Sequence, residues 1–164
     1  MIYRVLKHMF SPRWLLRSRF QLSLLNEIER RIGDVERVHP GELRFVVEHA
    51  LELGDLLVGL SPRERALEIF GLLRVWDTEH NSGILIYVLH AEHAVEIVAD
   101  RGIAQRVPQA DWDALCGVME KEFVAGRYGE GALAAVNGAA ALLEKHFPAQ
   151  TGGRNELPDQ PLLL

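Results

Sequence analysis

The segment that most constrains this chain is Gly83-Ile-Leu-Ile-Tyr-Val-Leu89, in which every residue after the glycine is aliphatic or aromatic. It is too short to cross a bilayer, which takes about 20 residues, and it lacks the alternation of a half-exposed strand. We therefore predict a central strand over residues 84–89 with both faces buried. Residues 94–99 alternate after a polar break at residues 90–93, which predicts an antiparallel hairpin at about 84–99.

Elements before and after this hairpin predict an α/β domain. Helical spacing of apolar residues predicts a helix over residues 22–39, and apolar–polar alternation predicts a strand over residues 43–48. Ser61-Pro62-Arg63-Glu64 has the pattern of a capping box with proline at the first helical position, which predicts a helix over about 61–76. Two more helices are expected, one starting at Pro108 and one over about 130–146.

Charge is distributed unevenly along the chain. The sequence has 18 Lys and Arg residues, 23 Asp and Glu residues and a formal net charge of −5. Residues 1–20 hold five of the basic residues and none of the acidic ones, so the remaining residues sum to −10. An acidic body argues against a nucleic-acid partner. The basic segment suits an anionic membrane surface or a membrane protein.

Large apolar residues are interleaved with the basic residues of this N-terminal segment, as in a helix that lies at a membrane interface. In the alternative interpretation Trp14, Leu15 and Phe20 pack on the domain while the arginines stay solvated. The candidate residues for a membrane or partner contact are Arg4, Lys7, Arg13, Trp14, Arg17 and Arg19. The first ten residues lack the features of a secretion signal, so we expect a cytoplasmic protein that can lie at the inner face of the membrane.

Three segments are expected along the chain. Residues 1–20 form the basic head, residues 21–147 form the folded domain, and residues 148–164 form a tail. The tail contains Pro148, Pro158, Pro161 and Gly152-Gly153, and this composition predicts disorder.

The loop Asp77-Thr-Glu-His-Asn81-Ser-Gly83 has oxygen donors at alternate positions, as in half of a calcium-binding loop. It is not an EF-hand, because its glycine comes one place late and Val88 replaces the glutamate. A different Ca²⁺ or Mg²⁺ site would need another loop, and hairpin pairing places Asp100 at the same open end as Asn81. The metal candidates are therefore Asp77, Asn81 and Asp100.

Other patterns that indicate chemistry are weaker. His90 and His93 lie in the predicted hairpin turn without a zinc motif, so we expect solvated histidines there. Cys116 lies among apolar residues of a predicted helix, which indicates a core thiol. The sequence has no phosphate-binding loop, dinucleotide fingerprint or nucleophile elbow, so no nucleotide cofactor is expected.

Four separated segments resemble the TPM domain family, and their order along the chain is that of the family. They are Arg65-Ala-Leu-Glu-Ile-Phe70, Trp76-Asp-Thr-Glu-His-Asn-Ser-Gly-Ile-Leu-Ile-Tyr87, Val95-Glu-Ile-Val-Ala-Asp-Arg-Gly-Ile103 and Phe123-x-x-Gly126-x-Tyr128-x-x-Gly131. The resemblance covers roughly residues 20–147 and is to compact single-domain bacterial members. The family's Asn-Asn-Gly before the central strand reads Asn81-Ser82-Gly83 here.

The resemblance implies a three-layer α/β/α sandwich with a short mixed sheet. Members of the family occur in photosystem maintenance, as receptor-accessory proteins and as bacterial proteins tied to membranes. Some are described as acid phosphatases, and some bind calcium or other divalent ions at loops on one end of the sheet.

Two functions follow as hypotheses. The first is an accessory or interaction module near membrane proteins that uses residues 1–20 as its contact and binds a divalent cation. The alternative is a metal-dependent, acid-phosphatase-like hydrolase, in which Asp77, Asn81 and Asp100 hold the metal and Arg101 contacts phosphate oxygens. No complete catalytic set is visible in the sequence, so enzymatic activity stays open.

Overall fold

The computed structural model describes residues 2–147 and 154–164. Four strands form one mixed sheet in the order β3-β2-β1-β4. Strand β1 runs parallel to both β2 and β4, and β2 is antiparallel to β3. The strands are β1 (Glu42–Glu48), β2 (Gly83–Leu89), β3 (Ala94–Ala99) and β4 (Leu162–Leu163). The predicted hairpin and mixed sheet are confirmed.

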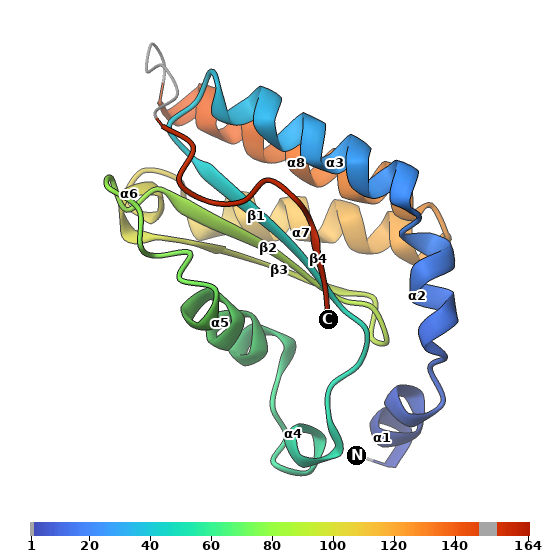
Figure 1. The fold of residues 1–164 in the computed structure, drawn as a ribbon. Helices are drawn as coiled ribbons and strands as arrows, with labels where there is room; N and C mark the ends of the chain where they lie inside the picture. The colour runs from blue at the N-terminus through green and yellow to red at the C-terminus, as the bar shows by residue number, and fades with distance from the viewer. Residues whose placement is uncertain (1, 148–153) are drawn as a thin grey trace.

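Helices cover both faces of the sheet (Figure 1). One face carries α3 (Leu22–Glu36), α7 (Gln109–Val124) and α8 (Tyr128–His146), and the other carries α5 (Pro62–Leu72). This arrangement confirms the three-layer α/β/α sandwich.

Alternation along the strands divides the core into two clusters. Every residue of β2 is buried, as expected for a central strand. Ile84, Ile86 and Val88 belong to the larger cluster with α3, α7 and α8. Leu85, Tyr87 and Leu89 belong to the smaller cluster, which includes residues of α5. The period of two in strand side chains therefore sets both layers of packing.

Local signals place the start of α5 correctly but not its end. Ser61 accepts a hydrogen bond from the Glu64 N–H, and the Glu64 carboxylate accepts one from the Ser61 N–H, which completes the capping box. The helix ends at Leu72 instead of about residue 76. Arg74 adopts a left-handed backbone with φ of 52°, which stops the helix and turns the chain toward β2.

The remaining helices are short. The basic head forms α1 (Ile2–Met9) and α2 (Arg13–Arg19), while α4 (Leu53–Leu57) and α6 (Arg101–Ala104) lie in connections of the domain. The α1 and α4 helices contact each other and lie together at one end of the molecule (Figure 1). No helix within the described ranges combines the length and apolarity needed to span a bilayer.

The expectation of a disordered tail is wrong for residues 154–164, while residues 148–153 lie outside the described residues. Leu162 and Leu163 pair with Val46 and Val47 of β1, and Leu157 is buried. Two side chains of β1 bind the main chain of the proline-rich part, because Arg44 donates to the Pro158 carbonyl and Glu42 accepts from the Leu157 N–H. These bonds satisfy a backbone that proline excludes from a regular ladder.

Substituting Gly83 tests how closely the backbone at Val75 packs against the start of β2. A Cβ at Gly83 would lie 1.8 Å from the Val75 carbonyl oxygen. We expect Gly83→Ala to lower the free energy of unfolding by roughly 1–3 kcal/mol, measured by urea denaturation.

The matched control is Gly117→Ala, because nothing lies within 4 Å of an added Cβ there. Alanine in this helical position should raise the free energy of unfolding by about 0.5–1 kcal/mol. Equal effects of the two substitutions would contradict the packing described for Gly83.

Candidate functional site

The open end of the hairpin brings together the Asn81 loop and the start of α6. The Asp100 N–H donates to the Gly83 carbonyl at 2.8 Å, and the Gly102 N–H donates to the Asn81 carbonyl at 3.0 Å. Asp100 Oδ1 caps α6 by accepting from the Arg101 N–H. Arg101 Nε donates to Asn81 Oδ1 at 2.8 Å. Asn81, Asp100 and Arg101 therefore form one polar cluster.

The fit of this cluster to a divalent cation is partial. Asp100 Oδ2 is shielded from solvent and has no hydrogen-bond partner among the described residues. Asn81 Oδ1, in contrast, already binds the cationic Arg101 side chain. Asp77 is exposed, and its N–H donates to the Arg74 carbonyl at 2.9 Å.

The opposite end of the hairpin carries a buried polar cluster that binds the head. Glu92 Oε1 accepts from Arg4 Nε and from His8 Nε2, both at 2.7 Å. His8 Nδ1 accepts from the Leu51 N–H at 3.0 Å, so the Nε2 atom of this ring carries the proton given to Glu92. Arg4 also donates to the Leu60 carbonyl at 2.7 Å. These bonds fix α1 against the hairpin turn.

The prediction of a solvated His90 is wrong, because this side chain is only 1% exposed. Arg19 Nη1 lies 2.9 Å from His90 Nε2, which must accept because a guanidinium only donates. Arg19 also lies over the Tyr128 ring, 4.4 Å from its centroid. Burial, together with Arg19, lowers the pKa of His90 to about 4. The α2 helix thus covers a turn that local sequence suggested was open.

His93 is half-buried beside the same ring of Tyr128. Its pKa is lowered by burial first, and then by the positive charges of Lys7 and Arg19. Cys116 is buried, as expected for a core thiol, and burial raises its pKa to about 12.

The candidate contact residues of the head separate into two groups. Arg4 and Arg19 turn inward to the hairpin, as described above. Lys7, Arg13, Trp14 and Arg17 are exposed. Phe20 packs in the core as the alternative interpretation expected, whereas Trp14 does not.

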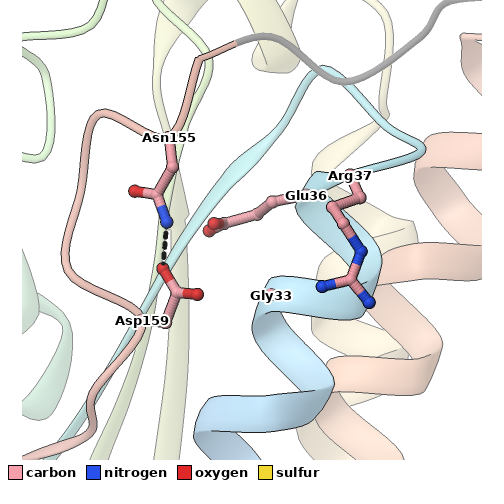
Figure 2. A pocket seen from close by; sticks show the side chains of 5 residues that line it. All are labelled: Gly33, Glu36, Arg37, Asn155 and Asp159. Atoms are coloured by element: carbon pink, nitrogen blue, oxygen red, sulfur yellow. Dashed lines mark hydrogen bonds between the residues drawn. The ribbon is translucent and has the colours of Figure 1, made fainter.

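A third polar site lies between α3 and the C-terminal segment (Figure 2). A cavity of about 140 Å³ is lined by Gly33, Glu36, Arg37, Asn155 and Asp159. Glu36 is 4% exposed, and its carboxyl group extends toward Asn155 and Asp159. Its Oε1 accepts from the Leu43 N–H at 2.7 Å, while no described residue bonds Oε2. Burial raises the pKa of Glu36 to about 9, with further contributions from Glu42 and Asp159.

The mixed four-stranded sheet between two helical layers makes this protein an α/β/α sandwich, with loops that meet at the open end of its hairpin. Residues 20–142 match the family model described as the TPM domain, so the chain belongs to the TPM domain family. The α1 and α2 helices and residues 154–164 lie outside this match.

Among solved structures, the chain is similar to the BA42 protein of the psychrophilic bacterium Bizionia argentinensis, determined by NMR. The TM-score is 0.75 and the sequence identity 26%, over 87% of this chain and 93% of that chain. No curated protein matches the chain.

The sequence patterns did not single out Glu36, Glu92 or His8. Glu92 was noted only as part of the hairpin turn, and its partners lie more than 80 residues away in the sequence. One signal was available for Glu92 and His8, because a helix with Arg4 and His8 one turn apart can place two donors on one carboxylate. Nothing local indicated that Glu36 meets Asp159 of the tail.

Replacing Glu36 should change how stability depends on pH. Because the pKa of Glu36 is raised in the folded state, the native protein keeps a proton that the unfolded chain releases near pH 4.5. Stability from this group is therefore full below that pH and falls as the pH rises toward about 9. When the pH is raised from about 5 to about 8, the free energy of unfolding should fall less for the Glu36→Gln variant than for the native chain.

Urea denaturation at the two pH values measures this difference. Glu144→Gln, which removes an exposed acid of α8, is the control and should follow the native chain. A Glu36→Gln variant with the native pH dependence would show that Glu36 ionises normally in the folded protein.

Proposed function

We propose that this protein is a peripheral TPM-domain module that docks on an anionic membrane surface. The docking surface is built by α1 and α4, which lie together at one end of the molecule, and by α2, which connects α1 to α3 (Figure 1). Membership of the TPM family supports the class of domain. The exposed side chains of residues 1–20 support the membrane contact.

The observation that carries the proposal is the orientation of α1. Its inward side presents Arg4 and His8 to Glu92. Its outward side exposes apolar residues, with Ile2 at 76% and Tyr3 at 80% of their full exposure. A surface helix of a globular protein normally buries its apolar side and solvates its polar side. Apart from Val5, which packs on the smaller core cluster, α1 exposes its apolar residues, as expected where a second apolar phase is available.

Further exposed apolar residues extend this outward side. Phe10, which follows α1, and Trp14 of α2 are also exposed. The neighbouring α4 exposes Leu53, Leu57 and Val58. An apolar surface of this kind marks an interaction site when it gathers in one region of a folded protein, and aromatic residues such as Trp14 and Phe10 favour the headgroup level of a bilayer.

Basic residues give this surface its preference for anionic lipid. Lys7, Arg13 and Arg17 are exposed, and no ion pair within the described ranges uses them. Each such residue near an anionic surface contributes about 1 kcal/mol. Glu52 and Asp55 at the start of α4 oppose this attraction, so the basic contribution comes from the α1–α2 side.

Vesicle flotation tests the proposal. The native chain should float with phosphatidylglycerol-containing vesicles and float less with phosphatidylcholine alone. Replacing Lys7, Arg13 and Arg17 together by glutamine should weaken binding to anionic vesicles by about 100-fold. Replacing Phe10 and Trp14 together by serine should weaken binding to both kinds of vesicle.

The control replaces three other basic residues, Arg74, Lys121 and Arg154, by glutamine. It carries the same change of net charge and should float like the native chain. Point substitutions are needed because deleting residues 1–20 would also remove Leu16 and Phe20 from the core. A native chain that does not float contradicts membrane docking, and a protein partner captured by the same surface would then replace the lipid.

Divalent-cation binding at the open end of the hairpin is a second candidate function. One observation favours it, the shielded and unpartnered Asp100 Oδ2. Asn81 and Asp100 would hold Ca²⁺ or Mg²⁺ there, and hard oxygen atoms suit either ion. The hydrolase alternative has no such support, because Arg101, its proposed phosphate contact, is bound to Asn81.

Removing the Arg101 side chain should strengthen cation binding, because it frees Asn81 Oδ1. A ligand that binds the folded state raises the melting temperature. We expect CaCl₂ or MgCl₂ at about millimolar concentration to raise the melting temperature of Arg101→Ala more than that of the native chain, and to leave Asp100→Asn unchanged. A shift of equal size in Asp100→Asn would place the cation elsewhere.

A further inference from the structure

The C-terminal segment lies along the open edge of β1 and is held mainly through its main chain. Leu163 and Leu162 pair with β1, and the His49 N–H donates to the Leu164 carbonyl at 3.1 Å. Glu42 Oε2 accepts from the N–H groups of Glu156 and Leu157, at 3.0 and 3.2 Å. Main-chain recognition of this kind accepts many sequences, as in strand addition to a sheet edge.

Two side chains of β1 extend this recognition beyond the short ladder. Arg44 Nη1 donates to the carbonyls of Pro158 and Gln160, two residues apart along the segment. Leu157 is the buried anchor, at 7% exposure in the smaller core cluster. The edge of β1 is therefore a groove with main-chain contacts and one apolar socket.

The chain's own segment fits this groove poorly in charge. Asp159 faces the buried Glu36 across the cavity of Figure 2, and Asp159 Oδ2 lies against Gly33 of α3. Glu156 lies beside Glu42, and the charges of Glu156 and Asp159 both raise the pKa of Glu42, after the larger effect of burial. Arg44 offsets part of this repulsion. Glu36 Oε2 still has no partner among the described residues.

We propose that the edge of β1 is a docking groove for an extended, basic segment of another protein, which the chain's own residues 154–164 occupy until that partner binds. The partner segment has a leucine at the place of Leu157 and a lysine or arginine two residues later, at the place of Asp159. Its cation would displace the proton that Glu36 keeps in the native chain and pair with the Glu36 carboxylate through Oε2. It would also replace an acid by a base beside Glu42.

Charge complementarity selects this occupant over a second copy of the chain. A second copy offers the same acidic residues Glu156 and Asp159, so exchanging the C-terminal segments between two copies would not improve the charge complementarity of the groove. The β1 residues of the groove lie within the part of the chain that matches the family model, whereas residues 154–164, which occupy the groove, follow the end of that match at residue 142. This proposal concerns a different surface from α1, α2 and α4 and does not depend on the membrane contact.

Peptide binding to the full chain tests the proposal. Leu157→Asp weakens the chain's own segment and leaves the groove residues intact. Three labelled peptides are compared by fluorescence anisotropy: residues 154–164 as they stand, the same residues with Glu156→Gln and Asp159→Lys, and the latter with Leu157→Ser. The charge-changed peptide should bind about tenfold more tightly than the native sequence, and the third peptide should bind less tightly than the second.

Adding Glu36→Gln to the protein separates the proposed ion pair from general attraction, because it should remove most of the preference for the charge-changed peptide. Arg44→Ala should weaken both leucine-containing peptides alike. Equal affinity for the two charge forms would overturn the proposal, as would a preference that survives Glu36→Gln. Absence of peptide binding to a folded Leu157→Asp chain would also overturn it.

A second variant keeps the proposal testable if Leu157→Asp does not fold. Asp159→Lys in the otherwise native chain should tighten the chain's own segment on the groove. Hydrogen exchange of the Leu164 and His49 amides should then slow by about tenfold, while Glu27→Lys, the same change of charge on exposed α3 surface, should leave both unchanged. Unchanged or faster exchange in Asp159→Lys would overturn the proposal.

Discussion

The pairing of Glu92 with Arg4 and His8 determines how the N-terminal helix meets the domain. The side chain of Glu92 is 19% exposed and that of His8 is 1% exposed, so both groups have already lost most of their contact with water. Breaking the pair would leave them without a hydrogen-bond partner, which costs free energy. The Leu51 N–H fixes the His8 ring in the tautomer that donates to Glu92. Polar bonds therefore orient α1, and its apolar residues other than Val5 are exposed.

The sheet gives this contact a rigid base and separates it from the other polar sites. The hairpin of β2 and β3 carries Glu92 and His90 at its turn and Asp100 at its open end. The third site lies along the edge of β1 that faces β4, where Arg44 and Glu42 hold the C-terminal segment. Three surfaces with different chemistry thus sit at the turn, the open end and the edge of one sheet.

Local signals predicted the parts of the fold that neighbouring residues decide. The apolar run 84–89, the alternation at 94–99 and the capping box at Ser61 each act over a few residues, and each appears in the structure. The proximity of Asn81 and Asp100 follows from hairpin pairing in the same way. Asp77 is exposed and shares no hydrogen bond with either residue, and the left-handed Arg74 before it is a conformation that the sequence did not indicate.

The features that the sequence did not predict depend on contacts between segments that are distant in the sequence. His90 reads as a turn residue, but Arg19 of the head covers it. The tail has a composition typical of disorder, but Glu42 and Arg44 bind main-chain groups of this segment that are not paired in the short β1–β4 ladder. Glu36 and Asp159 meet across more than 100 residues of sequence, so no local pattern points to their cavity.

Quenching of Trp14 fluorescence by brominated lipid is the most direct test of the outward side of α1 and α2 as a membrane contact. Trp76→Phe leaves Trp14, which is exposed, and Trp112, which is buried in the core. With anionic vesicles that carry bromine in their acyl chains, Trp14 emission should shift to shorter wavelength and be quenched. A matched Trp14→Phe chain, in which Trp76 is also replaced, should show neither change. A chain that binds the vesicles while Trp14 stays unquenched would contradict the account.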